Sequence, residues 1–158
     1  MFQNDSPPWR RSALHLAAAL ALALLLGGAG KADEALPGPV PAKVRRVLDG
    51  DTIEVEARIW LRQGVTVLVR LAGVDAPELD GACAAERQAA LRAREHVEHW
   101  LAGREIALVD VRTDKYGGRV LARVVDRAGA DLGETLLLAG LARTAGKGGR
   151  REPWCQAT

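Results

Sequence analysis

The order of strand-like and helix-like segments is the feature that most restricts the fold of this chain. Five short runs have β-branched residues alternating with polar ones, a pattern typical of half-buried strands. The runs lie at residues 43–48, 52–60, 65–74, 105–111 and 119–126. Asp49-Gly50 separates the first two runs and is a standard signal for a β-hairpin.

Two helical segments interrupt and follow these strands. Residues 83–103 are expected to form a long helix with Asp80 as its N-cap and Gly103 at its end. Asp131 and Glu134 open a second helix with capping-box spacing. The apolar stripe of the long helix consists of Ala90, Ala93, Val97, Trp100 and Leu101. This order predicts an α+β fold, a five-stranded barrel of the oligonucleotide-binding (OB) type with two to three helices.

The first 32 residues follow a different pattern. Arg10 and Arg11 precede an apolar run of 14 residues at 13–26, which is broken only by His15, and small residues follow this run up to Ala32. This order matches a secretory signal peptide, and the run is shorter than the ~20 residues that span a bilayer. We therefore expect a signal peptide at 1–32, a proline-rich linker at 33–41 and one domain at 42–155. The expected location is periplasmic or secreted, and an uncleaved N-terminal membrane anchor is the alternative.

The charge of the chain limits how it could attract nucleic acid, and its cysteines bear on a disulfide. Loss of residues 1–32 removes three of the 22 basic residues and one of the 20 acidic ones, so the remaining chain is close to neutral. A global basic field for nucleic acid is therefore not expected, and any attraction to phosphate must be local. Cys83 and Cys155 are the two cysteines. Export would permit a disulfide between them, and two free thiols are the alternative.

Several common kinds of catalytic site are excluded by the sequence, which leaves carboxylates as the main candidates for catalysis. The chain after residue 32 contains no serine, which excludes a serine hydrolase triad. His96 and His99 lie beside glutamates on the long helix, and we interpret them as part of a solvated face rather than as metal ligands. No glycine loop of the Walker type is present.

Acids cluster after two strands that are expected to be neighbours. Asp49 and Asp51 flank the first hairpin turn, while Asp75 and Glu78 follow the third strand, which contains Arg70. Clustered carboxylates repel one another unless a cation neutralises them, and ligands that are all oxygen favour a hard ion such as Ca²⁺. Such a site with an arginine suits attack on a phosphodiester. Taken singly, each motif is more simply a polar turn.

In combination, these motifs resemble the thermonuclease family, the staphylococcal-nuclease-like domains. The resemblance rests on DGDT at 49–52, VRLAGVDAPE at 69–78, RTDKYGGRVLARV at 112–124 and ETLLLAGLAR at 134–143. Their order and spacing agree with the family across about residues 42–145. The chain departs from the family in having a second glycine before Arg119. It also lacks counterparts of the family's base-stacking tyrosines after the second helix.

The resemblance implies a calcium site. Asp51 and Asp75 correspond to carboxylate ligands of Ca²⁺, and the backbone carbonyl of Ala76 to a further ligand. Asp49 corresponds to a partner of the ion that acts through water.

The resemblance also implies catalytic and substrate-binding residues. Glu78 corresponds to the residue that orients or deprotonates the attacking water. Arg70 and Arg119 correspond to the arginines that hold phosphate in the transition state. Lys115 and Tyr116 correspond to residues near the terminal phosphate of the nucleotide.

The implied activity is that of a Ca²⁺-dependent endonuclease acting on DNA and RNA, preferably single-stranded or frayed, with 3′-phosphate products. We expect a monomer without a stable protein partner. The alternative is a catalytically inactive OB-fold module that binds nucleic acid. Such a module would favour a basic, aromatic-rich face, whereas the chain after residue 32 has no phenylalanine and one tyrosine.

Overall fold

The structure, a computed structural model, describes residues 35–115, 117–146 and 153–155. The described residues belong to one compact unit, which spans 34–158. The predicted signal peptide at 1–32 and Tyr116 lie outside the described residues. Within the described residues, no helix is long and apolar enough to cross a membrane.

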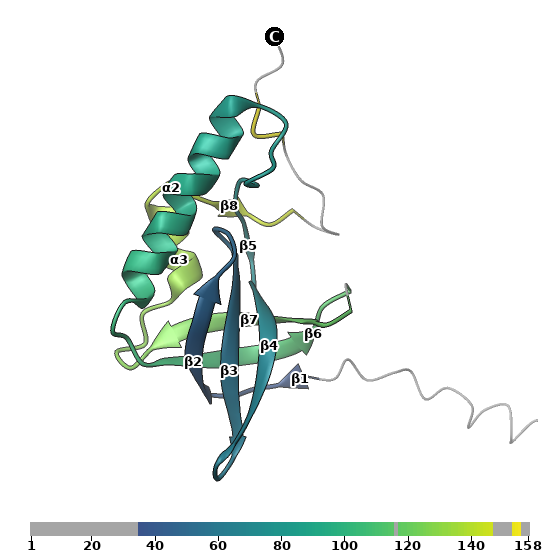
Figure 1. The fold of residues 1–158 in the computed structure, drawn as a ribbon, viewed down its shortest axis with the longest axis vertical. Helices are drawn as coiled ribbons and strands as arrows, with labels where there is room; N and C mark the ends of the chain where they lie inside the picture. Colours follow the sequence, from purple (N-terminus) through teal and green to yellow (C-terminus); the bar gives the residue numbers. More distant parts are fainter. Residues whose placement is uncertain (1–34, 116, 147–152, 156–158) are drawn as a thin grey trace, which may run out of the picture. The chain divides into compact units, whose positions relative to one another are not determined.

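Five strands close into a barrel (Figure 1). In order around the barrel they are β2 (Val40–Val47), β3 (Thr52–Trp60), β4 (Gln63–Leu71), β7 (Arg119–Asp126) and β6 (Ile106–Thr113). The β4–β7 pair is parallel, and the other pairs, including the closing β6–β7 and β2–β6 pairs, are antiparallel. The predicted α+β fold with an OB-type barrel is confirmed.

The alternation of residues along the strands explains why the barrel closes. Every second side chain of a strand points to the same face, and the inward set is apolar. Ile53 and Val55 of β3, Val69 of β4, Leu108 of β6 and Val124 of β7 are all fully or almost fully buried. Their interdigitation forms one hydrophobic core, to which the helices add a second layer of side chains.

Part of the predicted linker joins the barrel. β1 (Ala35–Leu36) pairs with Val111 and Arg112 in the C-terminal half of β6. β2 begins at Val40, three residues before the predicted strand. Pro41 forms part of the β2–β6 ladder although it lacks an N–H donor. The sequence pattern missed this pairing because prolines usually mark the end of a strand.

Two helices are described, and both lie at one end of the barrel (Figure 1). Helix α2 (Ala84–Leu101) buries the predicted stripe of Ala90, Ala93, Val97, Trp100 and Leu101. Gly103 follows its end with φ of 70°, as expected for a helix stop. The prediction of Asp80 as N-cap is wrong, because the helix begins later and Cys83 occupies that position without a side-chain cap bond.

Helix α3 (Leu132–Leu138) begins as predicted. The Asp131 side chain accepts a hydrogen bond from the backbone N–H of Glu134 and also pairs with Arg123. Asp131 is buried, and these two contacts compensate its charge.

A small second sheet joins β5 (Val74–Asp75) to β8 (Arg143–Thr144), and Asp75 lies opposite Arg143. Arg143 also contacts the C-terminal tail. Its guanidinium lies 3.9 Å from the centre of the Trp154 ring and donates a hydrogen bond to the carbonyl of Pro153. The predicted disulfide between Cys83 and Cys155 is present. It attaches the tail to the start of α2.

Candidate active site

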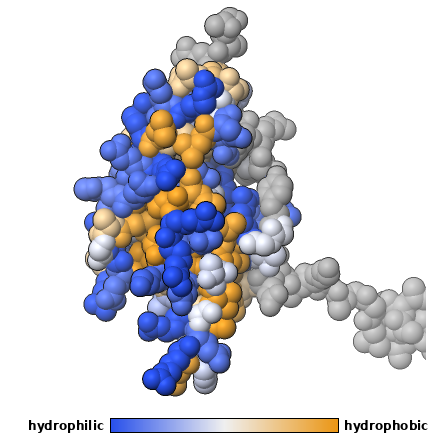
Figure 2. Space-filling view, in the orientation of Figure 1, coloured by the Kyte–Doolittle hydropathy of each residue, from blue (hydrophilic) through white to orange (hydrophobic). Residues whose placement is uncertain are grey.

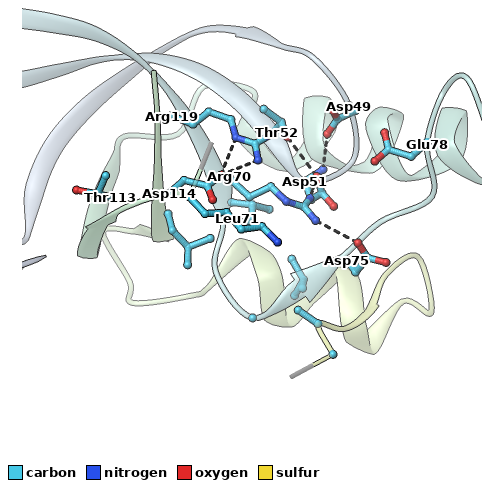
Figure 3. Close-up of a pocket in the computed structure, with 16 residues that line it drawn as sticks. Asp49, Asp51, Thr52, Arg70, Leu71, Asp75, Glu78, Thr113, Asp114 and Arg119 are labelled. Carbon is cyan, nitrogen blue, oxygen red and sulfur yellow. Dashed lines mark hydrogen bonds and ion pairs between the residues drawn. The ribbon is translucent and has the colours of Figure 1, made fainter. Parts of the chain in front are cut away.

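A cleft of about 850 Å³ opens where β3, β4 and β7 meet the loops that lead to the helices (Figure 3). Three stretches of the chain, at 49–52, 70–78 and 113–119, contribute polar side chains to it. The predicted site residues that line the cleft are Asp49, Asp51, Arg70, Asp75, Glu78, Lys115 and Arg119. The structure therefore brings together seven predicted side chains that lie up to 70 residues apart in the sequence.

The turn between β2 and β3 is shaped by its own backbone hydrogen bonds. The amides of Leu48 and Asp49 donate to the carbonyl of Thr52, and the Asp49 carboxylate accepts from the Asp51 amide at 2.9 Å. Gly50 is buried at the centre of this turn, where a Cβ atom would lie 2.7 Å from the Ala93 Cβ and 2.8 Å from the Ala76 Cβ. Only glycine therefore allows helix α2 and residue 76 to approach the turn this closely.

Asp51 connects the two acidic loops. Its Oδ2 accepts a hydrogen bond from the backbone N–H of Ala76 at 2.7 Å, and its Oδ1 accepts one from the Thr52 hydroxyl at 3.2 Å. Asp51 is only 4% exposed. A buried carboxylate that receives directed hydrogen bonds has one fixed orientation, so the loops after β2 and β5 are fixed relative to each other.

Arg70 lies between the two buried acids. Its guanidinium contacts Asp51 Oδ1 through Nη1 and Asp75 Oδ1 through Nη2, the latter at 3.1 Å. Register places Arg70 opposite Thr52 at the cleft end of the β3–β4 ladder. The arginine therefore compensates the negative charge of both carboxylates in this structure.

Arg119 is the first residue of β7 and lies opposite Leu68 in the parallel β4–β7 ladder. Its Nε and Nη2 both contact Asp114 Oδ2, at 2.8 and 2.6 Å. Gly118, with φ of 83°, lies in the turn before the strand. The second glycine that distinguishes this chain from the family pattern is thus accommodated in the turn, and Arg119 still faces the cleft.

Glu78 is half-buried on the wall of the cleft, on the same side as Asp49 and Asp75 in Figure 3. Lys115 is exposed at the rim. Tyr116, predicted to bind substrate next to it, lies outside the described residues. The backbone of Ala76 is placed by its bond to Asp51, and its methyl group is buried.

Burial raises the pKa of Asp49 above its ordinary value, and this effect outweighs the opposing hydrogen bond with Thr52 and the charge of Arg70. Asp49 therefore accepts a proton more readily than an exposed aspartate does.

The donor set of the cleft fits a hard cation. Asp51 and Asp75 converge on one positive group, the Arg70 guanidinium, which shows that the cleft accommodates positive charge between them. Carboxylate and carbonyl oxygens are the ligands that Ca²⁺ prefers. Cys83, Glu86 and Cys155 also form a close group, but both sulfurs belong to the disulfide and are not thiolate ligands.

Two residues of the site were not anticipated from the sequence. Asp114 orients Arg119, and the Thr52 hydroxyl holds Asp51. Each is adjacent in sequence to a predicted site residue. Their place within the motifs DGDT and TDKYGGR was the sequence feature that could have identified them as site residues.

A closed OB-type barrel with acids and two arginines in one cleft defines a nuclease-like domain rather than a simple barrel. The family model described as staphylococcal nuclease homologue matches residues 68–153. The chain belongs to this family. The match includes Arg70, Asp75, Glu78 and Arg119 and begins after Asp51. Comparison with curated proteins returns no match to the chain.

Proposed function

We propose that the chain is an exported, Ca²⁺-dependent endonuclease that hydrolyses phosphodiester bonds in DNA and RNA and leaves 3′-phosphate ends. The observation that carries the proposal is that two buried acids, Glu78 and two arginines line the same cleft. Binding of nucleic acid alone requires basic and aromatic surface rather than buried carboxylates beside arginines. Membership of the staphylococcal nuclease family also supports the proposal of a nuclease.

The two arginines are suited to hold the phosphate. Each guanidinium is oriented by carboxylates, Arg70 by Asp51 and Asp75, and Arg119 by Asp114. Phosphate oxygens bind the same planar donors, often in pairs. Negative charge on those oxygens increases as the bond breaks, so contacts that strengthen in the transition state lower the barrier.

Glu78 is suited to act on the nucleophile. A carboxylate on the cleft wall can accept a proton from a water molecule while that water attacks phosphorus. Asp51, Asp75 and the carbonyl of Ala76 are the residues that would hold Ca²⁺. The bound ion would supply positive charge to a phosphate oxygen.

The decisive experiment incubates the purified chain with a single-stranded DNA oligonucleotide. Ca²⁺, Mg²⁺ and a calcium chelator are compared, with Glu78→Gln as the matched inactive variant. We expect cleavage with Ca²⁺, little with Mg²⁺ because that ion demands stricter octahedral geometry, and none with chelator. Cleavage that persists in the chelator refutes the metal dependence. Binding without cleavage under every condition favours the inactive OB-fold module.

Substrate form is tested in the same assay. We propose that single-stranded or frayed DNA and RNA are preferred over paired duplex. Equal cleavage rates for an oligonucleotide and its fully paired duplex would contradict this preference.

We also propose export to the periplasm or medium after cleavage near Ala32. The disulfide supports an oxidising compartment, since such bonds are rare in the cytosol of most cells. N-terminal sequencing of the protein recovered from its native compartment tests the proposal. A start near residue 33 supports a signal peptide, whereas an intact N-terminus in the membrane fraction indicates an anchor.

A further inference from the structure

The end of the β3–β4 hairpin carries large apolar side chains with no core to cover them. Ile59, Trp60 and Leu61 are 57%, 69% and 81% exposed, and Val65 is exposed beside them. The hairpin points away from the helices (Figure 1), and Figure 2 shows orange and pale atoms next to blue ones at that end of the molecule. Several large exposed apolar side chains on one protruding turn make that turn a candidate contact surface.

A basic hollow of about 1030 Å³ adjoins this tip. Its cations include Lys43, Arg58, Arg62 and Arg104, and its acids are Glu56 and Glu105.

Both acids of the hollow are already paired, Glu56 with Arg45 at 2.5 Å and Glu105 with Arg127 at 2.6 Å. Among the described residues no carboxylate forms an ion pair with Lys43, Arg58 or Arg62. The hollow beside the tip therefore has a net positive charge.

We propose that the β3–β4 tip binds the surface of a bilayer that contains anionic phospholipid. The aliphatic side chains of Ile59 and Leu61 gain free energy on transfer into hydrocarbon. Tryptophan is favoured at the membrane–water interface, where Trp60 would lie. Arg58, Arg62 and Lys43 would then face the lipid phosphates, and such cations add electrostatic attraction to anionic headgroups.

Nucleic acid fits this surface less well. Single strands stack on successive aromatic rings, whereas Trp60 is the one ring that the tip exposes beside Ile59, Leu61 and Val65. The Trp60–Gln63 pair also lies at the opposite end of the β3–β4 ladder from the Thr52–Arg70 pair in the cleft. Eight residues of strand separate the two ends by about 25 Å. A molecule held by its tip would therefore keep the cleft accessible to substrate.

The test measures flotation of the Glu34–Thr158 unit, which has its own closed barrel and core. Omission of residues 1–33 prevents their apolar run from binding lipid. Vesicles of phosphatidylcholine are compared with vesicles of phosphatidylglycerol mixed with phosphatidylcholine. We expect the unit to float with the anionic vesicles and to remain largely unbound with the neutral ones.

Matched variants locate the contact. Ile59→Ser/Leu61→Ser should abolish flotation. Leu91→Ser/Leu138→Ser, which removes two leucines that are 58% and 89% exposed elsewhere, should leave it unchanged.

The contribution of the arginines and the insertion of Trp60 into the bilayer are measured separately, by binding affinity and by fluorescence. Arg58→Gln/Arg62→Gln should weaken binding roughly fivefold per arginine, whereas Arg92→Gln/Arg94→Gln on helix α2 should have little effect. Anionic vesicles should shift tryptophan emission to the blue, and Trp60→Phe should remove that shift.

Several results would overturn the proposal. They are absence of binding to anionic vesicles, or equal losses in the tip and control variants. Oligonucleotide affinity that depends on Trp60 without vesicle binding would identify a nucleic-acid surface instead. Dimerisation that the Ser variant abolishes, again without vesicle binding, would identify a second copy as the partner. Thermal melts establish that each variant is folded. If the Ser variant fails to fold, Arg58→Gln/Arg62→Gln and Trp60→Phe decide the question.

Discussion

The backbone N–H of Ala76 donates a hydrogen bond of 2.7 Å to Oδ2 of Asp51, across 25 residues of sequence. This bond joins the turn after β2 to the loop after β5. Both partners are buried, so the bond is protected from competition with water. This bond and the contacts of Arg70 with Asp51 and Asp75 together fix the relative positions of the proposed metal ligands.

Asp51→Asn should weaken calcium binding at least about tenfold, because interactions of a charged group each contribute about 1.5–3 kcal/mol. The measurement is the rise in melting temperature on addition of Ca²⁺, which reports binding to the folded state. Asp80→Asn, at an exposed acid beside the site, is the control and should respond like the unmodified protein. An undiminished calcium response in Asp51→Asn would remove Asp51 from the ligand set.

Arg70→Lys and Arg119→Lys should each lower kcat by about a hundredfold, or ~3 kcal/mol of transition-state stabilisation. Lysine keeps the charge but lacks the planar fork that binds two oxygens. Steady-state kinetics with a fluorescent oligonucleotide gives kcat, and circular dichroism verifies the fold. Arg127→Lys, at an exposed position, should be nearly unaffected. Normal turnover in Arg119→Lys would show that this arginine does not contact the reacting phosphate.

Gly50→Ala should destabilise the domain and impair catalysis without a change of charge. The added methyl group would lie within 2.8 Å of both Ala93 and Ala76, and overpacking of this kind costs about 1–3 kcal/mol. Melting temperature and cleavage rate should fall together, since Ala76 would move relative to Asp51. Gly117→Ala, where no atom lies within 4 Å of the new Cβ, is the control. A Gly50→Ala protein with unchanged stability would contradict the packing argument.

Reduction of Cys83–Cys155 should lower the melting temperature. The two residues are 72 positions apart, and closing a loop of that length stabilises a fold by about 4 kcal/mol in the chain-entropy model. The calcium response should remain, because no predicted metal ligand lies in the tail. Intact mass after alkylation, with and without reductant, verifies the bridge before the melts are compared. Two alkylated thiols in unreduced protein from an oxidising compartment would refute it.

Asp126 should make stability dependent on acid pH. Its burial alone would raise its pKa, but hydrogen bonds from the amides of Ala130 and Ala128 and the charge of Arg104 lower the pKa below its ordinary value of 3.8. A lowered pKa in the folded state contributes stability above about pH 4, and this contribution is lost as the pH falls. Asp126→Asn should therefore melt lower than the unmodified protein at pH 7, with a smaller difference near pH 3. A difference that is constant with pH would contradict this assignment.

The sequence predicted the features that depend on periodicity. Alternation identified β3 and β7, and three- and four-residue spacing identified the buried face of α2, because these patterns follow directly from strand and helix geometry. The DGDT and VDAPE motifs identified the acids of the cleft, since both flank predicted strands.

Features that depend on tertiary contact were not predictable in this way. The bond between Asp114 and Arg119 requires the turn geometry before β7, which no periodicity encodes. Cys83 is the N-cap in place of Asp80 and also carries the disulfide to Cys155, a long-range contact that helix periodicity does not encode. The pairing of β1 with β6 likewise depends on a neighbour some 75 residues away.

The parallel β4–β7 pairing has a consequence for how such proteins diversify. Arg119 is positioned by its ladder with β4, and the turn before it absorbs the second glycine. A change in the length of that turn would alter the rim of the cleft and the contact of Asp114 with Arg119, while the β4–β7 ladder still holds the backbone of residue 119. The β6–β7 turn is accordingly the part of the cleft wall where a change of sequence should alter access to the cleft more than it alters the barrel.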